Sequence, residues 1–370
     1  MIQDTARVQR LRPIAAATTF LTMTTNPRLL GLATALPPHR VTQDETLATA
    51  RAIFSPRMRD FDRLAPVFPN TGIETRHTCM PLEWYLEPRG WPERMEAFQD
   101  KALDLLEAAA ATALERARLR PADVDAIVCA CTTGIATPSL EALLLERMGF
   151  RPDTVRLPLF GLGCAGGALG LARAAMTARA MPGKTVLFLV VELCTLAFRP
   201  GEATPTNVVA SALFADGAAA AVLRLDEGEG PRLLASAEHT WPGTRSVMGW
   251  RVEDDGLGVI FRQDIPDIVR TRFRGVTDDF LSREGLALTD LAGLVCHPGG
   301  TKVLLAIEEV MAPVGEGLSD AWAVLRDCGN MSAASVMFVL ERRLDAGAKG
   351  LQLLTALGPG FTAGLMLVEV

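Results

Sequence analysis

The glycine-rich stretch Gly161-Leu-Gly-Cys-Ala-Gly-Gly167 separates two segments with different residue patterns. The mostly apolar residues 155–160 before it predict a strand, and the Ala-, Leu- and Arg-rich residues 168–180 after it predict a helix. Cys164 is therefore expected in a strand-to-helix turn, where backbone N–H groups and the helix dipole favour an anion. A thiol in that position is expected to ionise more easily than a free thiol, and the glycines let other atoms approach the sulfur closely.

Two other interpretations of this stretch stay open at this level. Gly161, Gly163 and Gly166 match the G-x-G-x-x-G fingerprint of dinucleotide-binding proteins, with Glu192 as the acid that would bind the ribose. A fingerprint that stands alone is weak support for such a site. Alternatively, Cys164 is a buried residue that packs as a small hydrophobic side chain.

The composition argues against several functional classes. The chain has 370 residues, of which 49% are hydrophobic, and a net charge of −6, so a large core is expected and no nucleic-acid-binding surface. No apolar run reaches the roughly 18 residues that a membrane helix needs, so no integral membrane segment is expected. Seven scattered cysteines are typical of free thiols in a reducing compartment, which predicts a cytoplasmic protein. Because no H-E-x-x-H or C-x-x-C motif occurs, we expect no metal.

The first residues differ from the rest of the chain. Three arginines precede a short apolar segment, residues 14–23, which vaguely resembles a signal peptide but is interrupted by threonines. We expect residues 1–27 to form a flexible N-terminal extension. From Arg28 onward the pattern is that of a globular protein, with residues 55–95 irregular and residues 97–117 forming a long amphipathic helix.

An internal repeat organises the globular part of the chain. Four segments recur in the same order, the first three of them about 167 residues later. The pairs are residues 119–129 and 286–296, 163–164 and 329–330, 183–189 and 350–356, and 214–217 and 361–364. The repeat predicts two copies of one α/β unit, an N-terminal half at residues 28–230 and a C-terminal half at residues 231–370.

The repeat has a chemical consequence for three residues. Cys164 and Asn330 each open an Ala-rich helix, and His297 follows the second-half strand that corresponds to the strand ending near Cys131. Functional residues of open α/β sheets gather beyond the carboxyl ends of the strands. Pseudo-twofold packing of the halves would therefore bring Cys164, His297 and Asn330 into one cavity. The dinucleotide interpretation does not account for this convergence, and it puts a side chain where a pyrophosphate should lie against bare backbone.

Four motifs resemble those of the type III polyketide synthases, the chalcone synthase superfamily within the thiolase fold. They are Gly161-Leu-Gly-Cys-Ala-Gly-Gly167, Cys296-His-Pro-Gly-Gly300, Gly329-Asn-Met-Ser-Ala-Ala-Ser335 and Gly358-Pro-Gly-Phe361. The similarity extends from about Arg28 to the C-terminus, with agreement in motif order, spacing and length. The resemblance implies a thiolase-like α/β fold with two duplicated αβαβα halves, and an acyltransferase that works as a homodimer.

The resemblance also implies a Cys-His-Asn catalytic site. Cys164 would be the nucleophile that takes an acyl group from a coenzyme A thioester. His297 would keep the thiol ionised and donate a hydrogen bond to the thioester oxygen. Asn330 would donate to the enolate that forms when malonyl-CoA loses carbon dioxide. Taken alone, His297 could equally be a core histidine. An asparagine such as Asn330 is more often a helix N-cap than a catalytic residue, and it can be both, since capping fixes its orientation.

Further positions are implied at the substrate cavity. Phe214 matches an aromatic gatekeeper between the coenzyme tunnel and the cavity, and Val259 matches a second gatekeeper that is aromatic in the plant enzymes. Ala197 stands where the plant enzymes carry threonine, and Thr137 stands where they carry methionine, on the loop that reaches across the dimer. Each departure leaves room for a longer acyl chain, unless other side chains fill the space. Gly360 is a further candidate for substrate binding.

The expected reaction is the decarboxylative condensation of a long-chain fatty acyl-CoA with malonyl-CoA units, followed by cyclisation to an alkylpyrone or alkylresorcinol-type product. Residues 248–256 also resemble bacterial members that use fatty acyl starters. No cofactor is expected beyond the CoA thioester substrates, for which Arg63 is a candidate binding residue. Two alternatives stay open: an initiating ketoacyl-acyl-carrier-protein synthase, which makes one condensation with a carrier-bound extender, and a non-catalytic scaffold or binding protein with this fold.

Overall fold

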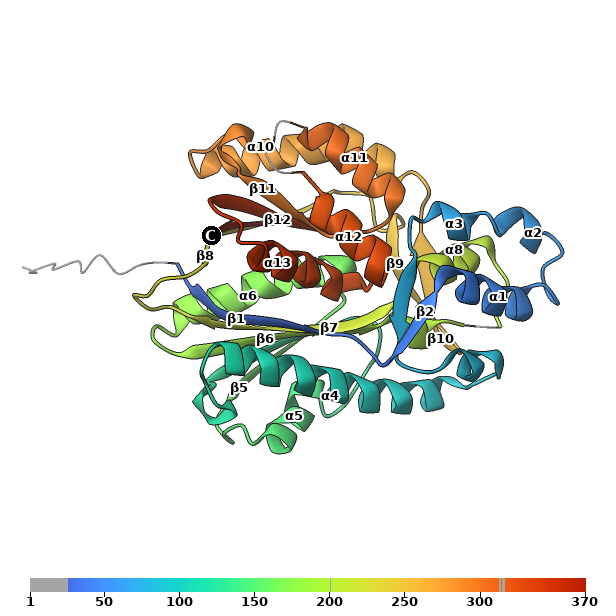
Figure 1. The fold of residues 1–370 in the computed structure, drawn as a ribbon, viewed down its shortest axis with the longest axis horizontal. Helices are drawn as coiled ribbons and strands as arrows, with labels where there is room; N and C mark the ends of the chain where they lie inside the picture. The colour runs from blue at the N-terminus through green and yellow to red at the C-terminus, as the bar shows by residue number, and fades with distance from the viewer. Residues whose placement is uncertain (1–25, 200, 313, 315–316) are drawn as a thin grey trace, which may run out of the picture.

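Two helices, α6 (Gly166–Ala180) and α13 (Ser335–Asp345), lie at the centre of the molecule between two groups of strands (Figure 1). Each of the two helices contacts strands of both groups. The computed structural model describes residues 26–199, 201–312, 314 and 317–370. The expected flexible extension, residues 1–27, lies outside the described residues except for its last two positions.

The two groups of strands join into one sheet. In pairing order, the first-half strands are β1 (Arg28–Ala35), β7 (Asp216–Arg224), β6 (Thr185–Leu193), β4 (Ala126–Cys131) and β5 (Val155–Phe160). The second-half strands are β8 (Arg232–Thr240), β13 (Thr362–Glu369), β12 (Leu351–Gly358) and β11 (Gly293–Cys296). A pair between Arg28 and Arg232 connects β1 to β8, so the described residues form a nine-stranded sheet. β5, β4 and β6 pair in parallel, as do β11 and β12.

Strand β6 shows why the sheet lies between layers of helices. All nine of its residues are buried, as expected for a strand that is covered on both faces. Because successive side chains point to opposite faces, they enter two different cores. One core contains α6 and takes Val186, Phe188 and Val190. The other contains α4 and takes Leu187, Leu189 and Val191.

Helices on the two outer faces complete the layers. α4 (Trp91–Arg116) and α5 (Leu140–Met148) pack on the first group of strands. α10 (Arg274–Arg283) and α11 (Thr301–Met311) lie on the opposite side of the molecule, and α12 (Ser319–Cys328) lies beside the central helix α13 (Figure 1). The layers therefore follow the order α-β-α-β-α, which confirms the thiolase-like α/β class. α4 begins earlier than the predicted residues 97–117, because Pro92 stands in its first turn, where a missing N–H group costs nothing.

The predicted repeat is visible in the strand order. β1-β7-β6-β4 in the first half correspond to β8-β13-β12-β11 in the second, and each half has a 3₁₀ turn before its central helix. The turns are η3 (Gly163–Ala165) and η6 (Ser332–Ala334). Cys164 lies inside η3, whereas Asn330 precedes η6. The two residues therefore occupy neighbouring positions in the repeat, not the same position as the sequence comparison suggested.

Small elements cover one end of the molecule, on the right in Figure 1. They are α1 (Gln43–Phe54), α2 (Phe61–Leu64), α3 (Val67–Asn70), α8 (Pro205–Leu213), the pair β2 (His39–Thr42) and β3 (Thr75–Thr78), and the hairpin β9 (Met248–Glu253) and β10 (Gly256–Phe261). Shorter segments are η1 (Leu82–Leu86), η2 (Pro121–Asp123), α7 (Cys194–Ala197), α9 (Ile265–Ile268), η4 (Val269–Phe273) and η5 (Leu288–Asp290). No helix in the described residues is long and apolar enough to cross a membrane.

Candidate active site

Cys164, His297 and Asn330 line one small cavity, as the repeat predicted. Cys164 comes from the η3 turn that precedes α6, His297 follows the last residue of β11, and Asn330 lies between α12 and η6. Apolar side chains, including Met248, complete the walls of this catalytic cavity. The three sequence-predicted catalytic residues therefore come together from both halves of the chain.

Asn330 is the most firmly held of the three. Its backbone N–H donates to Leu213 O at 3.0 Å, and its carbonyl accepts from Ala215 N at 2.9 Å. In the side chain, Oδ1 accepts from Ser332 N at 2.9 Å and Nδ2 donates to Gly299 O at 3.2 Å. An amide nitrogen carries two hydrogens, so one N–H of Asn330 is left to donate into the cavity.

His297 is 5% exposed, and neither ring nitrogen has a hydrogen-bond partner among the described residues. Its backbone N–H donates to Thr355 O at 2.9 Å, which ties the residue to β12. Burial lowers the pKa of His297 to about 3, because the charged imidazolium loses its hydration. The ring is therefore neutral near pH 7, with one nitrogen able to accept a proton and the other able to donate.

Burial acts against the easily ionised thiol that was predicted for Cys164. The residue is 8% exposed, and burial raises the pKa of its thiol to about 12, although a hydrogen bond with the Ser332 side chain acts in the opposite direction. The easily ionised thiol expected from the sequence stays a prediction. The loss of hydration outweighs the helix N-terminus, because α6 begins only at Gly166, after the η3 turn that holds Cys164.

The loop between β12 and β13 lies directly against the Cys164 turn. A Cβ atom on Gly163, whose φ is +50°, would lie 2.5 Å from Pro359 Cδ, and one on Gly358 would lie 2.6 Å from Leu162 O. Glycine at these two positions is therefore required for the close approach of the two segments. Gly360 belongs to the same loop and its carbonyl accepts from Thr244 Oγ1 at 3.1 Å, but it is not among the residues that line the cavities described here.

A buried carboxylate supports the Cys164 turn from behind. Glu192 accepts from Thr132 N at 3.1 Å, Thr133 N at 3.0 Å and Thr133 Oγ1 at 2.7 Å. Thr132 Oγ1 in turn accepts from Gly163 N at 3.0 Å. Burial raises the pKa of Glu192 to about 7 despite these hydrogen bonds. The carboxylate points into the protein, so it cannot serve as the ribose-binding acid of a dinucleotide site, and sequence reasoning missed its supporting role.

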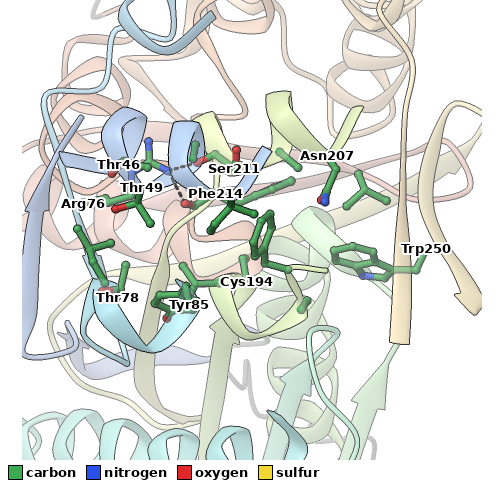
Figure 2. Close-up of a pocket in the computed structure, with 18 residues that line it drawn as sticks. Thr46, Thr49, Arg76, Thr78, Tyr85, Cys194, Asn207, Ser211, Phe214 and Trp250 are labelled. Atoms are coloured by element: carbon green, nitrogen blue, oxygen red, sulfur yellow. Dashed lines mark hydrogen bonds between the residues drawn. The ribbon is translucent and has the colours of Figure 1, made fainter. Parts of the chain in front are cut away.

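Ala197, Phe214 and Val259 line a second, apolar cavity, the inner pocket, whose volume is about 80 Å³. Figure 2 shows Trp250 at one end of this pocket and Arg76, Thr46 and Thr49 at the other, with Phe214 and Cys194 between them. Tyr85, Asn207 and Ser211 also line this pocket. Three of the predicted substrate-binding residues therefore share one cavity.

A wider cavity of about 480 Å³, the entrance pocket, lies on the other side of α8. Arg63, Arg262 and Lys302 line it, and Phe214 and Val259 line both this pocket and the inner one. Arg63 was predicted for this role, whereas Arg262 and Lys302 were missed, although Lys302 follows the His-Pro-Gly-Gly motif closely. Thr137 is exposed and lines none of these cavities.

Titratable side chains do not gather elsewhere into a metal-like cluster. Among residues 26–199, 201–312, 314 and 317–370, no group of three or more His, Cys, Asp or Glu side chains could hold a metal ion. The cysteines in this part of the chain form no disulfide.

Comparisons with known proteins identify the same family as the sequence motifs. Residues 21–227 match the family model "Chalcone and stilbene synthases, N-terminal domain", and residues 232–370 match "Chalcone and stilbene synthases, C-terminal domain". A 1,3,6,8-tetrahydroxynaphthalene synthase from Streptomyces peucetius subsp. caesius is 39% identical over 346 residues, 91% of each chain. A putative chalcone synthase from Bacillus subtilis (strain 168) is 35% identical over 92% of this chain and 97% of that protein.

A solved structure extends the likeness to the whole fold. The crystal structure of 1,3,6,8-tetrahydroxynaphthalene synthase from Streptomyces coelicolor A3(2), a bacterial type III polyketide synthase, has a TM-score of 0.85 to this chain at 28% identity. The match covers 92% of this chain and 99% of that one.

Proposed function

The chain belongs to the chalcone and stilbene synthase family of type III polyketide synthases, and we propose that it condenses an acyl-CoA starter with malonyl-CoA units and then cyclises the product. The observation that carries the proposal is the single cavity that Cys164, His297 and Asn330 line together. No cofactor is part of the proposal, because the CoA thioesters are themselves the substrates. An initiating ketoacyl-acyl-carrier-protein synthase is disfavoured by the family matches.

In the first step the starter is transferred to Cys164. The thiol is protonated at rest, because burial raises its pKa to about 12, so the neutral imidazole of His297 must take the proton as the sulfur attacks the thioester carbonyl. The tetrahedral intermediate collapses, the CoA thiolate leaves, and it takes the proton from the imidazolium. His297 returns to its neutral state, and Cys164 carries the acyl group.

In the second step malonyl-CoA loses carbon dioxide, and the electron pair of the broken C–C bond forms an enolate. The free N–H of Asn330 and the N–H of His297 donate to the enolate oxygen, which stabilises the developing charge. An uncharged amide does this without protonating the enolate. The enolate carbon attacks the acyl carbonyl on Cys164, the sulfur leaves and regains a proton, and the chain is now longer by two carbons on CoA.

The entrance pocket suits the coenzyme A part of the substrates. Arg63, Arg262 and Lys302 line it, and cationic side chains favour the binding of phosphate groups. The pocket shares lining residues with the catalytic cavity, namely Phe261, Ile265, Gly299 and Val303. It shares Phe214 and Val259 with the inner pocket. An acyl chain that extends from the entrance pocket into the inner pocket would therefore pass Phe214 and Val259. We propose that they separate the coenzyme from the growing chain.

The inner pocket supports a fatty acyl starter. Its wall is mostly apolar, which suits a hydrocarbon chain, and its volume is about 80 Å³ against about 480 Å³ for the entrance pocket. A second candidate follows from the relative that is a 1,3,6,8-tetrahydroxynaphthalene synthase. In that case the product would be a fused aromatic polyketide without an alkyl chain.

Product analysis separates these candidates. Purified protein is incubated with malonyl-CoA alone, or with acyl-CoA starters from short to long and aromatic, and products are identified by mass. Alkylpyrone or alkylresorcinol masses from long starters would support the fatty acyl proposal. Tetrahydroxynaphthalene from malonyl-CoA alone would support the second candidate. Products that need malonyl-carrier protein would move the chain to the initiating synthases, and no acylation of Cys164 under any condition would leave a binding protein.

Ala197 tests the role of the inner pocket. Ala197→Phe fills space in that pocket, so we expect the preference for long over short starters to fall at least about tenfold, since a misfit of a few methylene groups costs that much. Competition between two acyl-CoA starters, followed by mass spectrometry, measures the preference. Ala237→Phe, outside the cavities, is the matched control, and an unchanged preference in Ala197→Phe would contradict the assignment of the pocket.

We also propose that two copies of the chain associate through β5. This strand is at the end of the sheet, and Phe160 on it is 59% exposed. Edge strands with exposed apolar side chains favour association with another chain. Pro158 within β5 removes one backbone donor, so we expect side-chain contacts to dominate. Thr137, on the loop that follows the neighbouring strand β4, would then lie close to the second copy.

Light scattering tests the homodimer. Phe160→Glu should halve the mass in solution, because a charge would be buried without a partner at the contact. Val252→Glu changes an apolar residue on the β9–β10 hairpin that is more exposed than Phe160, and it should leave the mass unchanged. A monomeric wild type, or a dimer that survives Phe160→Glu, would contradict this proposal.

A further inference from the structure

Arg76 is a buried cation whose hydrogen bonds all go to neutral oxygens. The residue lies on β3 and is 1% exposed. Its guanidinium donates to Phe214 O at 2.7 Å and to Ser211 O at 3.0 Å (Figure 2). It also donates to Ala212 O and Gln43 Oε1. A buried charge is costly unless strong hydrogen bonds compensate for its lost hydration, so this arrangement calls for a reason.

The oxygens that Arg76 binds are at the C-terminal end of α8. The last carbonyls of a helix have no partner within the helix, and the negative end of its dipole attracts a cation. Gln43 supports the same turn, because its Nε2 donates to Ala212 O at 3.1 Å and to Phe68 O at 2.9 Å. Arg76 and Gln43 together form a clamp that holds the end of α8 in place.

The clamped segment carries two parts of the site at once. Phe214 directly follows α8 and lines both the inner pocket and the entrance pocket. The neighbouring residues Leu213 and Ala215 form the backbone hydrogen bonds that hold Asn330, at 3.0 Å and 2.9 Å. A shift of the C-terminal end of α8 would therefore move the Phe214 side chain and the Asn330 amide together.

We propose that Arg76 is a positioning residue for the malonyl step, which it serves by fixing the end of α8 and through it Asn330. The inference rests on the proposed function, because it assumes that Asn330 stabilises the enolate. Cys164 lies in a different segment, the η3 turn of the first half, and it is linked to the clamp less directly than Asn330 is, through Ser332, whose backbone N–H donates to Asn330 Oδ1 and whose side chain bonds the thiol. Arg76 should therefore affect decarboxylation of malonyl-CoA more than acylation of Cys164.

The experiment measures these two steps separately in Arg76→Lys. Lysine keeps the charge, but its single ammonium group cannot reach the four oxygens that the two ends of the guanidinium span. We expect decarboxylation of malonyl-CoA to fall about 10- to 100-fold, the effect of displacing a donor by a fraction of an ångström to 1 Å. Single-turnover acylation of Cys164, followed by intact mass, should fall less than about threefold.

Arg94 provides a matched control. It is also buried, and it donates to the carbonyls that end another helix, α7, with Leu196 O at 3.2 Å and Phe198 O at 2.8 Å. It makes no hydrogen bond to residues 211–215 or to Asn330. Arg94→Lys should lower stability in a similar way, but because Arg94 also holds Ala197 of the inner pocket, it should lower acylation at least as much as decarboxylation. Thermal unfolding of both variants checks that they are folded.

A second variant keeps the test decisive if Arg76→Lys does not fold. Gln43→Met loosens the same clamp without leaving a buried position empty, and should also lower decarboxylation more than acylation, by a smaller factor. Equal losses in the two steps for both clamp variants would overturn the positioning role.

The wild type and Asn330→Ala separate this inference from the proposed function. If the wild type neither acylates Cys164 nor decarboxylates malonyl-CoA, the proposed function itself fails. If Asn330→Ala retains wild-type decarboxylation, the assumed role of Asn330 fails, and the role of Arg76 fails with it. If Asn330→Ala loses decarboxylation and the clamp variants do not, only the inference about Arg76 is overturned.

Discussion

The two turns that open the central helices carry different chemistry and are held in different ways. Asn330, before η6, is fixed by hydrogen bonds on its backbone N–H, its carbonyl and both ends of its side chain. Cys164, inside η3, is buried at 8% exposure, and the one side-chain hydrogen bond that acts on its thiol comes from Ser332. The duplicated framework therefore presents one donor fixed by four hydrogen bonds and one nucleophile in a tightly packed turn.

This difference has a chemical meaning for the proposed reaction. A donor that stabilises a transient charge works best when it is oriented before the charge appears. A nucleophile that forms and breaks a covalent bond must instead move between thiol and thioester. Burial keeps the thiol protonated until a substrate and His297 are both in place, which prevents unproductive reactions.

The largest effect should come from removing the nucleophile. Cys164→Ala should lower condensation more than about 10⁴-fold, as removal of a covalent nucleophile does in other enzymes, and no acyl adduct should be detected by intact mass. Cys328→Ala removes a thiol outside the three cavities and should leave condensation near the wild-type rate. Residual acyl adduct in Cys164→Ala would show that another cysteine carries the chain.

The pH dependence of alkylation tests the protonation state of the Cys164 thiol. Burial raises the pKa of Cys164 to about 12 and that of Cys328 to about 11. Because both values lie above the tested range, the thiolate fraction and the rate with iodoacetamide should rise about tenfold per pH unit from pH 6 to 9 at both residues. Peptide mapping at each pH measures the rates. A plateau at Cys164 alone would show that His297 holds a thiolate at rest, as the sequence interpretation had it.

The smallest effect should come from Ser332, which connects the two turns. Its hydroxyl lowers the pKa of Cys164, so Ser332→Ala should raise that pKa further and slow acylation about three- to tenfold, the size of one hydrogen bond. Single-turnover acylation followed by mass spectrometry measures the change. Ser335→Ala is the matched control, because that hydroxyl accepts from Met331 N at 2.8 Å instead. Equal losses of acylation rate in both variants would contradict a direct effect of the Ser332 hydroxyl on Cys164.

Much of the fold and the three candidate catalytic residues followed from the sequence. Residues 119–129 and 286–296 predicted equivalent strands, which the structure contains as β4 and β11. Residues 155–160 and 168–180 predicted the strand and helix that flank Cys164, observed as β5 and α6. These patterns were readable because periodicity and turn residues act over short distances along the chain.

Other features escaped the sequence because they depend on distant segments. Arg76 and α8 are far apart along the chain, and nothing in either segment indicates that one would bind the end of the other. Glu192 looked like a candidate ribose acid until its carboxylate was found to accept hydrogen bonds from Thr132 and Thr133. Long-range pairs such as these have no local pattern.

By itself the sequence determined the duplicated α/β plan and the residues that supply sulfur, imidazole and amide, because local pattern and motif spacing encode them. Only the tertiary structure decided the chemical state of those groups. Burial raises the pKa of Cys164 to about 12 and lowers that of His297 to about 3, because each group loses its hydration when the two halves close around it. Desolvation depends on every atom that surrounds a group, and those atoms come from all parts of the chain.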